Sequence, residues 1–217
     1  MLQCLHRIKT ILTKLIPPEP AARLFILMKD LLRNIRSCTV CADLPLGPRP
    51  IVQASTKSKI LLIGQAPGKK VHEKGTPWDD PSGRNLRKWM DVTEQEFYDP
   101  SNFALVPMGF CYPGTGKSGD LPPRKECAPL WHQELLDRMP NIQLTLLFGQ
   151  YAQKQYLGDR LKKTLTETVR NFNEYLPDYL PLVHPSPRNA VWQKKNPWFM
   201  EEVIPELQGR IRKAIDS

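Results

Sequence analysis

The sequence has no long uninterrupted apolar run. None of its hydrophobic stretches approaches the roughly 20 residues that a helix needs to span a bilayer. The opening segment, residues 1–18, is broken up by basic side chains and lacks the apolar core of a secretory signal; an amphipathic helix that ends at Pro17-Pro18 fits it better. We therefore expect a cytoplasmic protein with no membrane partner.

Low-complexity linkers and a surplus of acidic residues are also absent. The 217 residues are 41% hydrophobic, which is enough for one sizeable core. We expect a monomer with a helical extension over residues 1–36 and a single folded domain over 37–217. The 31 Lys and Arg residues outnumber the 22 Asp and Glu residues, and the net charge of +9 favours a polyanionic partner.

Four short apolar runs recur along the chain, at residues 59–64, 103–108, 144–149 and 179–184. Apolar residues have helical spacing before, between and after these runs, at 21–36, 83–90, 124–139, 150–157 and 198–215. Strands that alternate with helices form parallel sheets with helices on both faces. The pattern predicts a three-layer α/β/α fold with a central, mainly parallel four-stranded sheet and an N-terminal helical extension.

The segment after the last apolar run places a titratable imidazole, His184, at the start of a proline-stiffened loop. Ligands of parallel sheets bind beyond the carboxyl ends of the strands. Such a loop can contact DNA phosphates through Ser186 and Asn189, with Pro187 in the same turn, while Arg188 enters a groove or fills the gap left by an extruded base. The alternative is a proline-rich surface turn that begins with an ordinary histidine.

The loop Gly64-Gln65-Ala66-Pro67-Gly68 follows the first apolar run directly. Its small residues allow a ligand to approach the backbone N–H groups closely. This pattern predicts a pocket for a base or a phosphate. A plain turn between a strand and a loop is the alternative.

Trp78 lies just downstream and offers an aromatic ring for stacking on a base. A core tryptophan is the alternative interpretation. Two carboxylates, Asp79 and Asp80, stand beside it. We interpret Asp80 as the N-cap of the helix that begins near Gly83.

The glycine-rich segment 114–119 has only part of a phosphate-binding P-loop. Cys111 stands where the first glycine is required, and no helical pattern follows, which excludes a nucleotide triphosphatase. Lys117 and Ser118 remain available for DNA phosphates. We expect salt-sensitive DNA binding that runs through Arg188, Lys117 and Arg84.

Cysteine is scarce, but four of the five cysteines form pairs. Cys38 and Cys41 make a C-x-x-C motif, and fifteen residues separate Cys111 from Cys127. Four thiolates from two segments can bind zinc or an iron–sulfur cluster. The C-x-x-C motif alone is equally compatible with a redox-active pair, and Cys4 is a spare hydrophobic residue.

Together these motifs resemble the uracil-DNA glycosylase superfamily, particularly its iron–sulfur branch, from about residue 37 to the C-terminus. Segments 64–68, 75–78 and 184–189 are similar to the branch's Gly-Glu-(Ala or Gly)-Pro-Gly, Gly-Arg-Pro-Phe and His-Pro-Ser motifs. The positions that match the branch's cluster ligands are Cys38, Cys41, Cys111 and Cys127. The resemblance implies a [4Fe-4S] cluster, with zinc as the alternative.

The sequence departs from the superfamily at its motif carboxylates. The iron–sulfur branch has Glu at the position of Gln65, and the classical branch has Asp at that of Ala66. The Asn that reads the uracil edge in relatives falls near Pro107. The resemblance still implies base excision repair, by a glycosylase that flips uracil or a related deaminated base out of DNA and hydrolyses its N-glycosidic bond.

The resemblance also implies roles for individual residues. Backbone N–H groups of Gln65 and Ala66 hold a base carbonyl, and Trp78 stacks on the base. His184 stabilises charge on the departing base. Gln65 orients the attacking water, and Asp79 is the nearest substitute for the missing carboxylate, although a loop or cap role explains Asp79 equally well.

Two other functions remain compatible with the sequence. The missing carboxylates favour a catalytically weak or inactive DNA-binding homologue that keeps a structural metal cluster. A zinc-stabilised module with a nucleotide ligand is the third hypothesis.

Overall fold

The computed structural model describes residues 20–117 and 119–217. The amphipathic helix expected before Pro17-Pro18 lies outside this range, as does Ser118. A helix, α2 (Pro20–Arg36), begins the described part of the chain. None of the helices in residues 20–117 and 119–217 is long and apolar enough to cross a bilayer.

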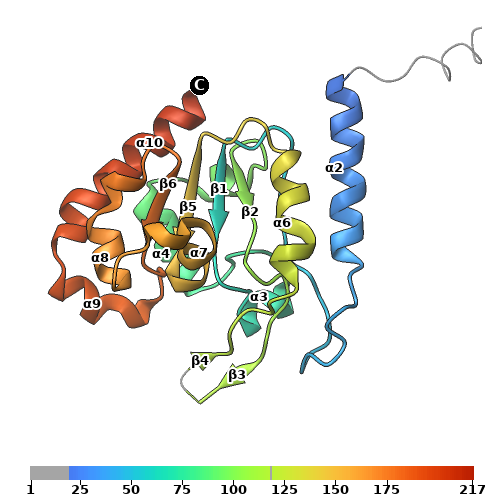
Figure 1. Cartoon of the computed structure of the whole chain (residues 1–217), viewed down its shortest axis with the longest axis horizontal. Coiled ribbons are helices and arrows are strands. Elements are labelled where there is room, and N and C mark those ends of the chain that lie inside the picture. The colour runs from blue at the N-terminus through green and yellow to red at the C-terminus, as the bar shows by residue number, and fades with distance from the viewer. Residues whose placement is uncertain (1–19, 118) are drawn as a thin grey trace, which may run out of the picture.

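A four-stranded parallel sheet forms the centre of the molecule (Figure 1). Its strands are β1 (Ile60–Ile63), β2 (Phe103–Leu105), β5 (Leu144–Phe148) and β6 (Tyr179–Leu182). They lie in the order β2-β1-β5-β6, and all three neighbouring pairs are parallel. The predicted fold class is therefore confirmed.

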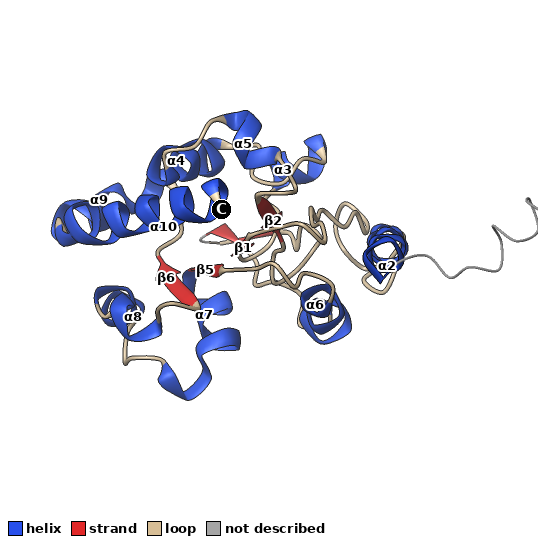
Figure 2. Ribbon diagram, turned by 90° about the horizontal axis from the view of Figure 1, so that it is seen from above, coloured by secondary structure: helices blue, strands red, loops and turns tan. Residues whose placement is uncertain are grey.

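Helices cover both faces of the sheet (Figure 2). One layer contains α4 (Pro81–Met90), α5 (Glu94–Tyr98) and α10 (Ile204–Asp216), and the other contains α2, α6 (Cys127–Asp137) and α7 (Gly149–Leu157). Successive strand side chains point to opposite faces. Ile60 and Leu62 accordingly join one core cluster, and Leu61 and Ile63 join the other. Burial on both faces explains why the strand sequences are continuously apolar.

Shorter elements complete the chain. They are α3 (Lys69–Lys74), η1 (Gly158–Arg160), α8 (Leu165–Arg170), η2 (Phe172–Tyr175), η3 (Pro187–Asn189), α9 (Ala190–Lys195) and the π-helical segment η4 (Phe199–Val203). A small antiparallel hairpin consists of β3 (Thr115–Gly116) and β4 (Gly119–Asp120). It projects beyond the end of the sheet toward which β1 points (Figure 1).

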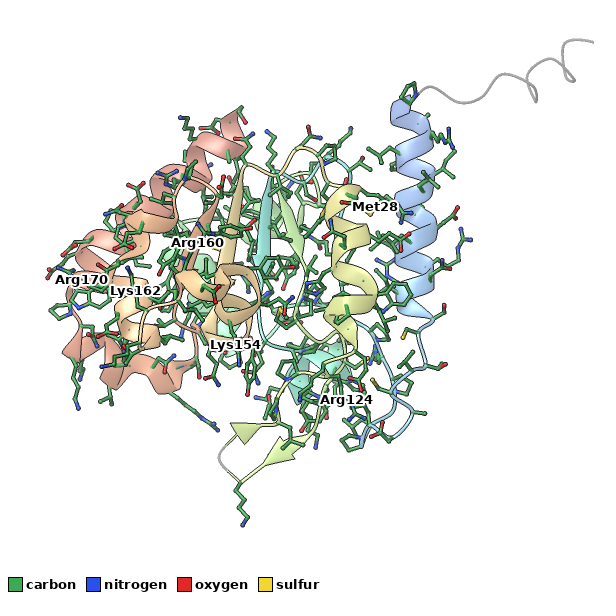
Figure 3. The ribbon with its side chains drawn as sticks, in the orientation of Figure 1. Met28, Arg124, Lys154, Arg160, Lys162 and Arg170 are labelled. Carbon is green, nitrogen blue, oxygen red and sulfur yellow. The ribbon has the colours of Figure 1, made fainter. Side chains whose placement is uncertain are left out.

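The apolar side of α2 packs into the core cluster that also contains residues of α6. Met28, Leu31 and Ile35 are buried in the cluster that also contains Leu135 of α6. Met28 lies between α2 and α6 (Figure 3).

The C-terminus lies at the opposite end of the sheet from the hairpin (Figure 1). There Lys59 Nζ donates a hydrogen bond to the carbonyl of Ile215 (2.9 Å), and Gln143 Nε2 donates one to Ser217 Oγ (3.0 Å). Lys59 and Gln143 directly precede β1 and β5, so the final helix is attached to the amino ends of the strands.

Candidate active site

A cavity of about 710 Å³ opens at the carboxyl ends of the strands. This volume is typical of sites for small ligands. Its wall is built by the loop after β1, the segment around Trp78, the end of β2, the hairpin and the loop after β6. The predicted site residues in this wall are Gly64, Gln65, Ala66, Pro67, Gly68, Trp78, His184, Ser186, Pro187 and Arg188.

Trp78 is held at the cavity wall in an unusual backbone conformation. Its φ of 58° lies in the left-handed region, which bulky residues seldom adopt. Two glycines make this position possible: a Cβ on Gly64 would lie 2.9 Å from Trp78 Cζ2, and one on Gly83 would lie 1.7 Å from the Trp78 carbonyl oxygen. Strained backbone of this kind is concentrated at functional sites.

The rings of Trp78 and His184 stack on one another at the cavity wall. Their ring centroids are 5.6 Å apart with an interplanar angle of 29°, and Trp78 also meets Phe148 edge-on at 5.6 Å. A base inserted between two rings would need about 7 Å, twice the roughly 3.4 Å spacing of stacked bases. A base in the cavity must therefore stack on a free ring surface and cannot insert between Trp78 and His184.

The imidazole of His184 is biased toward its neutral form. Burial lowers its pKa below the usual value, and the nearby Asp80 carboxylate opposes this shift only in part. A neutral imidazole can donate one hydrogen bond without carrying a charge.

The loop that carries His184 is fixed by hydrogen bonds to its backbone. Asn189 Nδ2 donates to the His184 carbonyl (2.6 Å), and Asn85 Nδ2 of α4 donates to the carbonyl of Pro185 (3.1 Å). Ser186 Oγ accepts from the backbone N–H of Arg188 (3.3 Å). The side chains of Ser186 and Asn189, predicted to contact DNA, therefore also stabilise this loop.

Asp80 has the predicted capping role and a position in the cavity wall as well. Its side chain accepts a hydrogen bond from the backbone N–H of Gly83 (2.8 Å) as the N-cap of α4, which confirms the prediction. Sequence reasoning missed its second position beside the cavity.

The hairpin supplies a wall that the sequence did not suggest. Thr115, Gly119 and Asp120 line the cavity. The side chain of Gln65 reaches the end of this hairpin, because its Nε2 donates to the carbonyl of Leu121 (3.2 Å), the residue that follows β4. The one sequence signal for Asp120 is an acidic residue within a glycine-rich segment downstream of Cys111.

A buried histidine, His132, stabilises the segment that follows β2. His132 Nε2 donates to the carbonyl of Pro107 (3.1 Å), so its Nδ1 accepts from the hydroxyl of Tyr156 (2.6 Å). Burial lowers the pKa of His132 and keeps it neutral, as this pattern requires. Pro107, which falls near the position of the base-reading Asn in relatives, lines the cavity.

Four predicted site residues lie away from the cavity wall: Asp79, Arg84, Lys117 and Asn189. The carboxylate of Asp79 instead pairs with Lys74 Nζ at 3.0 Å. Arg84 and Lys117 are exposed on α4 and in the hairpin turn. Their roles in catalysis and DNA binding stay predictions, and for Asp79 the geometry favours the loop role.

Cys38, Cys41, Cys111 and Cys127 line a second, small cavity between the end of α2, the loop after it and the start of α6. Burial and mutual proximity raise the pKa of Cys111 to about 11. Arg124 pairs with Asp43 next to this loop (Figure 3). Within residues 20–117 and 119–217, no group of three or more His, Cys, Asp or Glu side chains is close enough to hold a single metal ion.

Comparison with known proteins identifies the family. A solution NMR structure of a candidate uracil DNA glycosylase from Methanosarcina acetivorans is similar, with a TM-score of 0.42 and 13% sequence identity over 74% of this chain and 98% of that chain. The sequence matches the family model of the uracil DNA glycosylase superfamily over residues 52–208. Since this match spans most of the sequence, the chain belongs to the uracil DNA glycosylase superfamily.

Proposed function

We propose that the protein is a DNA repair glycosylase that receives an extruded damaged base in the 710 Å³ cavity and hydrolyses its N-glycosidic bond. The preferred base is uracil or a related deaminated base. The observation that carries this proposal is the joint position of Trp78, His184 and the loop after β1 in one cavity wall. These are the residues that the superfamily's motifs supply.

The loop after β1 would hold the base through its backbone. The carbonyls of Gly64 and Gln65 accept hydrogen bonds from the N–H groups of Met108 (2.8 Å) and Gly109 (3.0 Å). These bonds fix the loop, and among the described residues no hydrogen bond engages the N–H groups of Gln65 and Ala66, which would be the donors to a base carbonyl. Trp78 would stack on the base through the ring surface that faces the cavity.

His184 would stabilise the leaving base. As the bond between C1′ and the base nitrogen breaks, negative charge accumulates on the base. A neutral imidazole can donate a hydrogen bond to a carbonyl oxygen of that base, and such donors are worth most where water is excluded. The hydrogen bonds from Asn189 and Asn85 preorganise the loop for this role.

The four cysteines would bind a [4Fe-4S] cluster, with zinc as the alternative. One observation supports a metal centre: the thiols of the loop after α2, of the segment after β2 and of α6 line one cavity. When bound, the cluster would cross-link α2, the segment after β2 and α6. Iron, sulfide and zinc analysis of anaerobically purified protein tests this proposal. Detection of zinc without iron would contradict the cluster and support the zinc alternative.

Base release tests the enzymatic proposal directly. The substrates are single- and double-stranded oligonucleotides that each carry one deaminated base: uracil, hypoxanthine or xanthine. Alkaline cleavage at the abasic product reports the reaction. Parallel preparations of His184→Ala control for contaminating glycosylases, because a contaminant would act equally in both.

A DNA-binding role without catalysis is the second candidate. The observation that favours it is the hydrogen bond of Gln65 to the hairpin, since an amide used in this way holds structure at a position where relatives carry a carboxylate. Tight binding of DNA without release of any of these bases would support the second candidate.

A further inference from the structure

The loop after β1 lacks a carboxylate, but the carboxylate of Asp120 lies next to this loop. Asp120, the last residue of β4, lines the same cavity. Its Oδ2 lies 3.3 Å from the point where a Cβ on Gly68 would stand. The carboxylate oxygen therefore lies beside Gly68, in the loop in which Gln65 and Ala66 replace the acidic residues of relatives.

The residues around Asp120 are fixed relative to this loop. Gln65 Nε2 donates to the carbonyl of Leu121, whose own N–H donates to the carbonyl of Gly114 (2.8 Å). A hydrogen bond of 2.5 Å joins the hydroxyls of Tyr112 and Thr115. The amide at the position of the missing carboxylate thus holds the segment that carries Asp120.

The two neighbouring aspartates already have partners. Asp79 pairs with Lys74 outside the cavity wall, and Asp80 accepts the capping hydrogen bond of α4. Within the described part of the chain, no hydrogen bond occupies the carboxylate of Asp120. Asp120 is thus the carboxylate of the cavity that is best placed to bind water.

Two charges act on the Asp120 carboxylate in opposite directions. Burial raises its pKa, and Asp80 contributes in the same direction, while Arg188 lowers it. Arg188 comes from the opposite wall, and its Nη1 lies 3.4 Å from the point where a Cβ on Gly119 would stand. A carboxylate with a raised pKa is a stronger base than an ordinary one.

We propose that Asp120 is the general base of this enzyme and replaces the motif carboxylate that the loop after β1 lacks. The inference rests on the proposed glycosylase function. Asp120 accepts a proton from water as the water oxygen forms its bond to C1′. The bond from C1′ to the base breaks, its electron pair leaves with the base, and the anionic base then takes up a proton. The carboxylate also stabilises the positive charge that develops on the sugar.

Single-turnover base release against pH tests this role. Asp120→Asn should lower the rate by roughly 10²-fold or more and remove the fall of the rate at acid pH. Asp159→Asn is the matched control, because Asp159 is exposed on η1 outside the cavity wall, and its rate should equal that of wild type. Arg188→Ala should move the decline in the rate of base release to a higher pH. The reason is that Arg188 lowers the pKa of Asp120, so its removal should raise that pKa further. An unchanged rate and pH profile for Asp120→Asn would overturn the inference while leaving the glycosylase proposal intact.

A binding measurement tests Asp120 independently of turnover. The probes are two duplexes with an abasic-site analogue, one a cationic pyrrolidine and the other a neutral tetrahydrofuran. Wild type should prefer the cationic analogue by roughly tenfold or more, and Asp120→Asn should lose this preference. Asp120→Glu keeps the charge and should retain part of the preference. Equal preferences in wild type and Asp120→Asn would refute the role of Asp120, whereas failure of base release in wild type would refute the glycosylase proposal.

Discussion

The two walls of the cavity are held in different ways. On the aromatic wall, Trp78 fits between two glycines, and the backbone around His184 receives hydrogen bonds from Asn189 and Asn85. The hairpin wall consists of two strands of two residues each, and its side-chain connection to the loop after β1 is the amide of Gln65. The first wall is part of the core, and the second is attached to it.

This difference indicates a division of roles. A rigid donor is effective because it does not reorganise when charge develops, which suits the aromatic wall. Segments with few buried contacts open at low free-energy cost, which suits a wall that, in the proposed function, admits an extruded nucleotide. Removing single contacts from either wall tests this division.

The largest effect is expected from His184→Ala. The loss of a preorganised donor should lower the rate of base release by about 10²–10³-fold, or roughly 2.7–4 kcal/mol. DNA affinity, measured by fluorescence anisotropy, should be retained, because the interaction strengthens only in the transition state. Parallel losses of affinity and rate would instead assign His184 a structural role.

Gly83→Ala should disrupt the aromatic wall through the core. The new Cβ would lie 1.7 Å from the carbonyl oxygen of Trp78, so the backbone must shift. We expect the free energy of unfolding in urea to fall by about 1–3 kcal/mol. Gly209→Ala is the control, because a Cβ at this position would meet no atom within 4 Å. The substitution also removes a glycine from α10, so the free energy of unfolding should stay the same or increase.

Gln65→Glu should loosen the hairpin wall alone. A carboxylate cannot donate to the Leu121 carbonyl, and the lost hydrogen bond is worth about 0.5–1.5 kcal/mol. Amide hydrogen exchange should accelerate over residues 115–121, with little change in global stability. Gln208→Glu removes an equivalent hydrogen bond, from Nε2 to the Trp89 carbonyl (3.1 Å), and should leave hairpin exchange unaffected. Equal exchange in both variants would show that Gln65 does not hold the hairpin.

The smallest effect is expected from Arg188→Ala on the salt dependence of DNA affinity. Arg188→Ala should flatten the dependence of log affinity on log salt by about 0.9, the value for one lost phosphate contact. Arg212→Ala is the control, because Arg212 pairs with Glu96 away from the cavity. An unchanged slope for Arg188→Ala would remove Arg188 from the phosphate contacts.

The sheet and the aromatic wall could be predicted because their sequence signals are local. The apolar runs located all four strands, although β2 ends at Leu105 and the apolar run extends to residue 108. The helix expected over residues 198–215 begins as the π-helical segment η4 (Phe199–Val203) and continues as α10 (Ile204–Asp216). Short helices such as α5 and α8 were missed, although Thr93 and Thr164 begin capping boxes.

The hairpin wall could not be predicted from its own residues. Strands of two residues show no alternation, and the glycines at 114, 116 and 119 suggest an irregular loop. The position of Asp120 over Gly68 depends on contacts between segments about fifty residues apart. Asp79 was favoured by its sequence proximity to Trp78, and its pairing with Lys74 could be seen only in three dimensions.

The attachment of the last helix has a practical consequence for single-molecule work. Ile215 and Ser217 bind residues at the amino ends of β1 and β5, while the cavity opens at the carboxyl ends. Strands of four and five residues separate these ends by about 13–17 Å. A protein immobilised on glass through a C-terminal tether would therefore present its cavity to DNA in solution, and the length of the tether should not alter base release.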